Sequence, residues 1–199
     1  MNTKLGFWAA IILTICVILF AVFMVTVNDN FSYFICIILS WAYLILACCY
    51  FEKSEEDKKI FALVGVAFAI VYVVIIDIVY FTQLTTISHG LASNDVLNVL
   101  SYAILGSWMF NLDLFGYGML ALSTLFISFS IKPENKGDKW LKYLMMVHGV
   151  FAISCVIMPM MNVFSSDMAG GDFIGTAVLI FWCAYFAPIG ALSARYFKN

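Results

Sequence analysis

The chain has 199 residues, of which 64% are hydrophobic and only 11% are charged, whereas a soluble domain has about 45–50% apolar and about 25% charged residues. The formal net charge of −2 offers no basic surface, so we expect no nucleic-acid partner. The apolar residues form runs of about 20 residues, the length of a membrane-spanning helix. The sequence therefore predicts an integral membrane protein with one polytopic domain over residues 1–199 and the lipid bilayer as its surroundings.

Six apolar runs follow one another along the chain, and each is predicted to form a transmembrane helix. The first run is longer than the apolar part of a signal peptide and is followed by no small-residue cleavage site, so we expect it to be retained. The fold predicted is an all-α bundle of six transmembrane helices. These helices cover residues 5–27, 33–51, 60–82, 108–131, 143–164 and 173–196.

The longest connection covers residues 83–107 and contains an apolar stretch at residues 96–105. This stretch predicts a short interfacial helix before the fourth transmembrane helix. Its N-cap is expected at one of three polar residues, Ser93, Asn94 or Asp95. A single helix from residue 96 to residue 130 would be about 50 Å long, which exceeds a hydrocarbon core of about 30 Å. A separate short helix is therefore favoured.

Charge is divided unequally between the two ends of the predicted bundle. Every basic residue lies at one end: Lys4, Lys53, Lys58, Lys59, Lys132, Lys136, Lys139, Lys142, Arg195 and Lys198. The other end holds aspartates: Asp29, Asp77, Asp95, Asp113, Asp167 and Asp172. Because cytoplasmic loops carry an excess of Lys and Arg, both termini are expected in the cytoplasm (N-in, C-in). The short loops favour the plasma (inner) membrane as the location.

Small residues and proline predict how the helices pack and bend. Gly65 and Ala69 form a small-xxx-small pair on the third helix, which lets another helix approach closely. Pro159 is expected to bend the fifth helix. Two charged loops, residues 52–59 and 132–142, and a polar turn at residues 165–172 connect the predicted helices.

The fourth predicted helix carries a polar stripe inside an apolar run. At 100° per residue, Asp113, Tyr117, Thr124 and Ser128 fall on one face of this helix. A polar stripe in a membrane helix faces other helices or a water-filled cavity, because hydrocarbon offers its groups no partner. We therefore expect this helix to lie inside the bundle.

Two aspartates, Asp77 and Asp113, lie at matching depths near the outer ends of the third and fourth predicted helices. Such a pair predicts an outward-facing acidic pocket between helices, where a cation, a proton or an amine-bearing solute would bind. Side chains expected to add hydrogen-bond partners in this ligand-binding pocket are Tyr80, Asn111, Tyr117 and Asn162. In the alternative interpretation, each carboxylate bonds hydroxyls or amides and only orients the helices.

His148 lies near the inner end of the fifth predicted helix, deeper in the membrane than the aspartates. A proton relay from the aspartates to His148 through Thr124 and Ser128 is one interpretation. A histidine that is hydrogen-bonded within the bundle is the other.

No motif in the sequence indicates a catalytic or metal site. Intramembrane aspartyl proteases carry Gly-x-Gly-Asp, whereas Asp113 precedes Gly116 and Gly118 here. A Gly-x-Ser-Gly nucleophile, an H-E-x-x-H zinc helix and a C-x-x-C pair are all missing. The methionines of Met158-Pro-Met-Met161 suit Cu(I), but methionine is also an adaptable filler of apolar gaps. No cofactor is indicated, and an intramembrane enzyme has the least support.

Two functions follow from these features. The first is the binding or transport of a small solute, cation or proton through the acidic pocket. The second is a non-catalytic scaffold or accessory subunit of a larger membrane complex, in which polar residues serve helix packing and a partner subunit is expected. Loss of binding without loss of abundance after replacement of Asp77 or Asp113 would separate the two.

Overall fold

The computed structural model describes residues 2–26, 28–164 and 171–198, which are helical over most of their length and include no β-strand. Among these residues, six helical stretches are long and apolar enough to cross a membrane, so the predicted all-α fold with six candidate membrane spans is confirmed. The π-helix η2 continues α3, and η1 is a single 3₁₀ turn. The elements are α1 (Asn2–Val25), α2 (Asp29–Lys53), η1 (Glu56–Lys58), α3 (Lys59–Thr82), η2 (Gln83–Ile87), α4 (Asn94–Leu100), α5 (Trp108–Ser130), α6 (Lys136–His148), α7 (Val150–Met160) and α8 (Gly171–Lys198).

The fifth span differs from the continuous helix predicted over residues 143–164. It begins earlier, at Lys136, and is interrupted at Gly149 between α6 and α7. At the interruption the Gly149 N–H bonds the carbonyl of Met146, three residues back, at 3.1 Å, which tightens the turn. A Cβ at this glycine would lie 2.9 Å from the Cβ of Leu125, so glycine permits the close approach to α5. The break therefore falls well before Pro159, which lies inside the last turn of α7.

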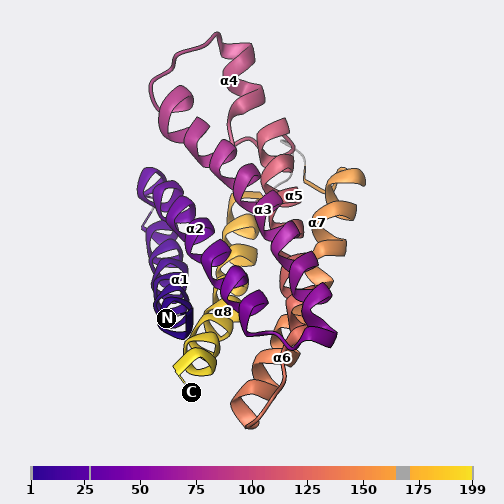
Figure 1. Ribbon diagram of the computed structural model, residues 1–199. Coiled ribbons are helices and arrows are strands. Elements are labelled where there is room, and N and C mark those ends of the chain that lie inside the picture. The colour runs from indigo at the N-terminus through magenta and orange to yellow at the C-terminus, as the bar shows by residue number, and fades with distance from the viewer. Residues whose placement is uncertain (1, 27, 165–170, 199) are drawn as a thin grey trace.

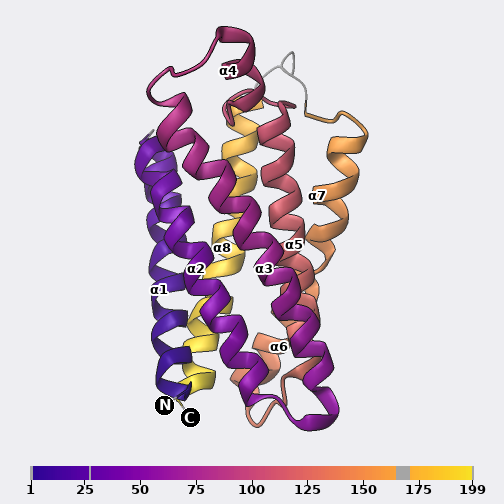
Figure 2. The same ribbon diagram turned by 45° about the horizontal axis from the view of Figure 1, so that its top comes forward.

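The six spans form a ring in which each packs on its predecessor in the chain (Figures 1 and 2). The ring is closed by the last span, since α8 packs on α1 and on α6, while α7 packs mainly on α5. Both termini lie at one end, and α4 lies at the other (Figure 1). The membrane-interface position of α4 and the N-in, C-in orientation stay predictions. The predicted turn at residues 165–172 lies largely outside the described residues, as do Asp167 and the side chain of Asp172.

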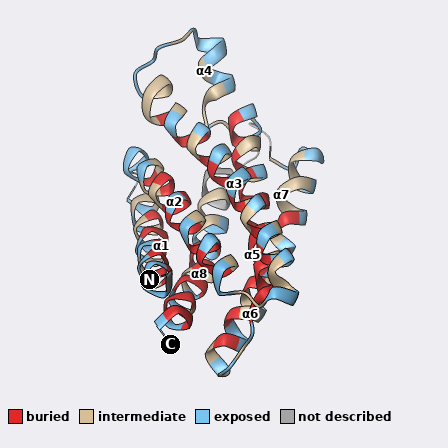
Figure 3. Cartoon of the chain, in the orientation of Figure 1, coloured by how far each residue is buried: buried red, intermediate tan, exposed pale blue. Residues whose placement is uncertain are grey.

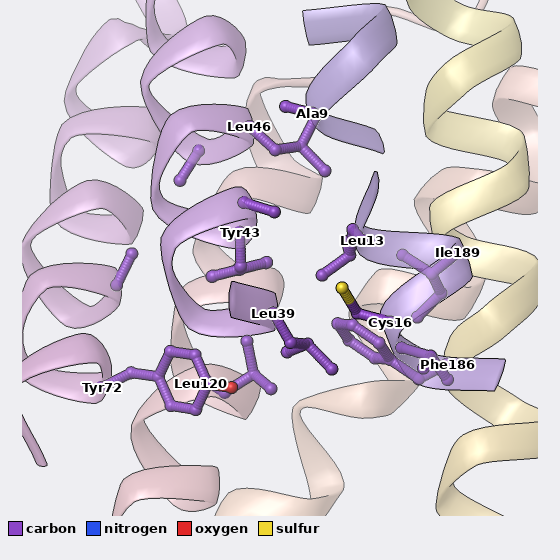
Figure 4. Packing of buried hydrophobic residues seen from close by; sticks show 14 of the residues in the cluster. Ala9, Leu13, Cys16, Leu39, Tyr43, Leu46, Tyr72, Leu120, Phe186 and Ile189 are labelled. Carbon is purple, nitrogen blue, oxygen red and sulfur yellow. The ribbon is translucent and has the colours of Figure 1, made fainter. Parts of the chain in front are cut away.

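The hydrophobic core runs down the centre of this ring, and buried residues mark the inward faces of the helices (Figure 3). Figure 4 shows Leu13 of α1, Leu39 of α2 and Phe186 of α8 packed near one another. Each of these three side chains is fully buried. The outward faces of the spans carry large exposed apolar residues such as Ile70 and Phe181. This distribution is what a bundle surrounded by hydrocarbon requires.

A chain of hydrogen bonds ties α2, α5 and α3 together at the middle of the bundle. The Tyr43 hydroxyl of α2 donates to the Ser123 hydroxyl of α5 at 2.8 Å. Ser123 in turn donates to the backbone carbonyl of Gly65 on α3 at 2.6 Å. The predicted small-residue contact on α3 is confirmed at Gly65, because a Cβ there would lie 2.5 Å from Ile127 of α5. Close backbone approach thus makes this interhelical bond available.

Helices that are far apart in the sequence meet where the ring closes. The Tyr50 hydroxyl of α2 donates to the Ser193 hydroxyl of α8 at 2.8 Å, across 143 residues of sequence. The Lys53 ammonium group donates to the carbonyl of Tyr196 at 2.7 Å. Gly190 of α8 lies against Thr14 of α1 so closely that a Cβ would overlap the threonine hydroxyl. The last span is therefore held by both of the first two.

The end of the bundle that holds the termini is also its basic end. There Lys132, which follows α5, pairs with Glu55 at 2.6 Å, and Lys58 pairs with the same carboxylate at 2.9 Å. These two ammonium groups, Lys132 before Lys58, lower the pKa of Glu55 to about 2. The α2–α3 connection is thereby joined to the α5–α6 connection.

We expect stability to fall modestly in acid through this cluster. Because the pKa of Glu55 in the folded chain lies below its ordinary value of 4.5, its contribution is complete above that value and is lost as the pH falls toward about 2. Thermal unfolding of wild type and Glu55→Gln between pH 2 and pH 7 measures the effect, which high salt should weaken.

Glu52→Gln is the matched control, because Glu52 makes no ion pair among the described residues. Its acid profile should follow that of wild type. An unchanged acid profile in Glu55→Gln would show that the cluster contributes nothing.

Candidate functional site

Asp113 is a buried carboxylate with an unused hydrogen-bond acceptor. It lies in the second turn of α5, is only 2% exposed, and its Oδ1 has no hydrogen-bond partner among the described residues. The helix that carries it is capped by Ser107, whose hydroxyl accepts from the backbone N–H of Phe110 at 3.1 Å. A buried polar atom without a partner is costly in a membrane interior, so this atom is a candidate binding position.

Asp113 is one of the residues that line a small, mainly apolar cavity of about 100 Å³ between α5, α7 and α8. Leu114 and Tyr117 of α5 line it, and Phe151 and Cys155 of α7 form one side. The opposite side is formed by α8 with Gly175, Val178, Leu179 and Trp182. We call this the inner chamber.

A second cavity of about 470 Å³ adjoins the inner chamber, and we call it the outer chamber. It is more polar, because Asp29 and Ser32 of α2 and Thr176 of α8 contribute to its wall. It lies near the starts of α2, α5 and α8, at the end of the bundle opposite the termini. The residues common to both chambers are Tyr102, Phe110, Gly175 and Leu179.

Tyrosines gather around both chambers. The Tyr117 hydroxyl, in the inner chamber, lies 3.5 Å from the Tyr80 hydroxyl and 3.8 Å from the sulfur of Cys36. Tyr80 lines the outer chamber, where its ring stacks on Tyr33 with centroids 5.4 Å apart. Tyr80, Tyr117 and Asp113 are therefore three predicted site residues that the structure brings together.

Tyr102 is held between the two chambers by a buried glutamine that the sequence analysis did not select. Gln83 is 2% exposed and begins the π-helix η2. Its side-chain amide donates to the carbonyl of Leu100 at 2.9 Å, and its Oε1 accepts from the N–H of Tyr102 at 2.9 Å. These bonds fold the α4–α5 connection back over the bundle. A glutamine at the end of a long apolar run was the signal in the sequence.

His148 is hydrogen-bonded to Trp182, one of the residues that line the inner chamber. The indole N–H of Trp182 donates to His148 Nε2 at 3.1 Å, so Nε2 carries no proton. The ring proton therefore sits on Nδ1, which lies 2.7 Å from the Thr124 hydroxyl and donates to it. The Thr124 hydroxyl donates in turn to the carbonyl of Ala121 at 2.9 Å. With every donor and acceptor used, this is the hydrogen-bonded histidine of the second interpretation.

The proton relay predicted from these residues is not assembled. Ser128 donates to the carbonyl of Leu125 at 2.6 Å and makes no bond to His148 or Thr124. A second proton on His148 would set its Nε2–H against the indole N–H of Trp182. The polar stripe of α5 is buried as predicted. Within this stripe, Thr124 bonds the His148 ring, which in turn accepts the hydrogen bond from Trp182.

Asp77 does not share a pocket with Asp113. Its Oδ1 accepts from the Ser40 hydroxyl at 2.9 Å and its Oδ2 from the Trp41 indole at 2.8 Å, both on α2. Neither chamber includes it. These bonds fit the interpretation in which a carboxylate orients helices. The matching depths of Asp77 and Asp113 did not indicate this, because depth does not determine the direction in which a side chain points.

Asn111 and Asn162 also lie outside the two chambers. The Asn111 amide donates to the carbonyl of Gly106 at 3.1 Å, within the turn that precedes α5. Asn162 is exposed beyond the end of α7 with φ at 51°, a left-handed conformation that asparagine tolerates after a helix. Its predicted place inside the fifth helix is wrong, because that helix ends at Met160.

No group of three or more His, Cys, Asp or Glu side chains in the described part of the chain is placed to hold a metal ion. Of the methionines considered for Cu(I), Met160 and Met161 are 76% and 71% exposed. Neither lines the two chambers. The acidic residue of the inner chamber is Asp113, which lies there among aromatic side chains.

Comparison with known proteins gives no relative from which a role could be transferred. No family model, no curated protein and no solved structure matches this chain. Function is therefore argued from the two chambers alone.

Proposed function

We propose that this protein binds a small organic amine at Asp113, as the recognition step of transport across the membrane. The observation that carries the proposal is the unpartnered Oδ1 of a buried carboxylate, on a residue that lines a cavity of aromatic and aliphatic side chains. A charged carboxylate in such surroundings needs an opposite charge beside it. An ammonium group provides that charge together with hydrogen-bond donors.

The size and lining of the chambers favour an amine with an apolar body over a bare metal ion. The inner chamber, about 100 Å³, is somewhat smaller than the cavity of about 150 Å³ that holds benzene in an engineered protein. It therefore suits an ammonium group with a few carbon atoms. Aromatic faces such as those of Tyr117 and Trp182 also attract a cation. The rest of the ligand would occupy the outer chamber.

The distribution of charge supports an orientation for this binding site. All basic residues lie at the end of the bundle that holds the termini, so that end is proposed to face the cytoplasm. The chambers, at the opposite end, would then take their ligand from outside the cell. Placement in the plasma membrane, with α4 lying at its outer surface, belongs to the same proposal.

Calorimetric titration of the purified chain in neutral lipid nanodiscs tests the proposal with hexylamine as the probe. We expect Asp113→Asn to weaken hexylamine binding by at least roughly 30-fold, the ratio for about 2 kcal/mol. Asp77→Asn is the matched control, because its carboxylate is already bonded to Ser40 and Trp41. It should keep the wild-type affinity. Hexanol, which lacks the charge, should not compete.

Unchanged hexylamine affinity in Asp113→Asn, or equal binding of hexanol, would contradict the proposal. A non-catalytic accessory subunit is the second candidate function, and Asp77 favours it because this membrane aspartate serves only to join α2 and α3. In that case Asp113→Asn would lower the abundance of the folded chain, and the wild type would bind no amine.

A further inference from the structure

We propose that the ligand is a linear diamine, with one ammonium group at Asp113 and the other at Asp29. This inference rests on the proposed function and names the class of amine. It is carried by two adjacent chambers that share four lining residues and have one aspartate each in their lining. Asp113 is the buried one with an unpartnered oxygen, and Asp29 lies in the wall of the outer chamber.

The two carboxylates lie at the same end of the bundle but at different depths. Asp29 is the first residue of α2, whereas Asp113 is in the second turn of α5, and both helices start at that end. Asp29 is exposed, so an ammonium group beside it stays partly hydrated. A ligand that contacts both carboxylates must therefore be extended, with a desolvated ammonium group at Asp113 and a partly hydrated one at Asp29.

The space between the carboxylates suits a chain of methylene groups. Tyr33, Tyr80 and Tyr102 line it in the outer chamber, with ring centroids 5.4–6.1 Å apart. Aromatic surfaces of this kind pack against methylene groups and attract the adjacent cationic ends. A ligand with a single charge would leave Asp29 unused.

Gly175 of α8 lines both cavities, and a Cβ added there would meet nothing within 4 Å. Packing therefore does not require a glycine at this position, and a larger side chain would extend into the open space beside both cavities. This gives a variant that fills part of that space while leaving both carboxylates in place.

Asp29 has a simpler structural role to be separated from ligand binding. A carboxylate in the first turn of a helix interacts favourably with the helix dipole, and that interaction needs no ligand. A dipole role changes stability, but it cannot make binding depend on the length of a diamine. The length dependence is therefore the decisive measurement.

The experiment compares monoamines with linear α,ω-diamines, from ethylenediamine to octamethylenediamine, by calorimetry in neutral lipid nanodiscs. We expect wild type to bind one diamine length roughly tenfold or more tighter than the monoamine of equal carbon number. Asp29→Asn should abolish the length preference, so that this diamine binds no tighter than the monoamine of equal carbon number. Asp95→Asn is the control, an exposed aspartate in the first turn of α4 that lines neither chamber.

Two further variants keep the test decisive if Asp29→Asn fails to fold. Asp29→Glu advances the carboxylate by one methylene, so the preferred diamine should become one methylene shorter. Gly175→Leu should weaken the preferred diamine more than ethylamine, which fits in the inner chamber. Equal affinities for diamines and monoamines, or a length preference unaffected by Asp29→Glu, would overturn this inference alone. If no amine of either kind binds, the proposed function itself is wrong.

Discussion

Replacing Gly65 by valine is expected to lower the free energy of unfolding by roughly 2–4 kcal/mol. A Cβ at this position would lie 2.5 Å from the Ile127 side chain and 3.1 Å from the backbone carbonyl of Ser123. The backbone of α5 cannot turn away as a flexible side chain would, so α3 and α5 must separate. Separation also breaks the bond from Ser123 to the Gly65 carbonyl. Unfolding in mixed detergent and SDS micelles measures the loss.

Gly175→Ala is the matched control for this prediction. It also replaces a glycine within a membrane-spanning helix, but the added Cβ would meet nothing within 4 Å. We expect its unfolding free energy to equal or slightly exceed that of wild type, because alanine is the better helix former. Equal stabilities of Gly65→Val and Gly175→Ala would show that α3 and α5 are not held by close contact at Gly65.

Replacing His148 by leucine is expected to cost about 2 kcal/mol or more and to weaken amine binding. Leucine accepts no hydrogen bond, so the indole N–H of Trp182, buried in the core, loses its acceptor. The Trp182 ring, which meets Tyr117 edge-on with centroids 5.0 Å apart, then has no bond to fix it beside Asp113. Unfolding and hexylamine titration measure the two effects.

Two companion variants distinguish a lost hydrogen bond from a general disturbance of packing. His148→Gln retains an amide oxygen for Trp182 and an amide N–H for Thr124, so it should recover part of the loss. Trp182→Phe removes the unpaired N–H, so the double variant with His148→Leu should be more stable than the sum of the single losses predicts. Full additivity of the two substitutions would contradict the assigned hydrogen bond.

The spans and one half of the candidate site could be predicted from the sequence. Apolar runs of about 20 residues fix helices that cross a membrane, and helical periodicity places Asp113 and Tyr117 on a buried face. Periodicity within one helix does not say which neighbour that face meets. Asp77 therefore seemed equivalent to Asp113 by depth, although Ser40 and Trp41 of α2 bind it.

The remaining differences arise from contacts between distant segments. The fifth span is interrupted at Gly149, where Leu125 of α5 lies close to the backbone, and the local sequence does not indicate that contact. Gln83 binds the backbone at Leu100 and Tyr102, which lie 17 and 19 residues further along the chain. At Gly149 and at Gln83 the contacting residue belongs to a distant segment, so it can be identified only from the fold.

The bond between Tyr50 and Ser193 sets a limit on how this protein can be made. The two hydroxyls are separated by 143 residues, so the partner of Tyr50 enters the bilayer only with α8. Until α8 has been made, the first two helices present their inward faces without the helix that covers them. A nascent chain released before α8 would therefore have an incomplete ring of helices, and the chambers would form only after α8 has inserted.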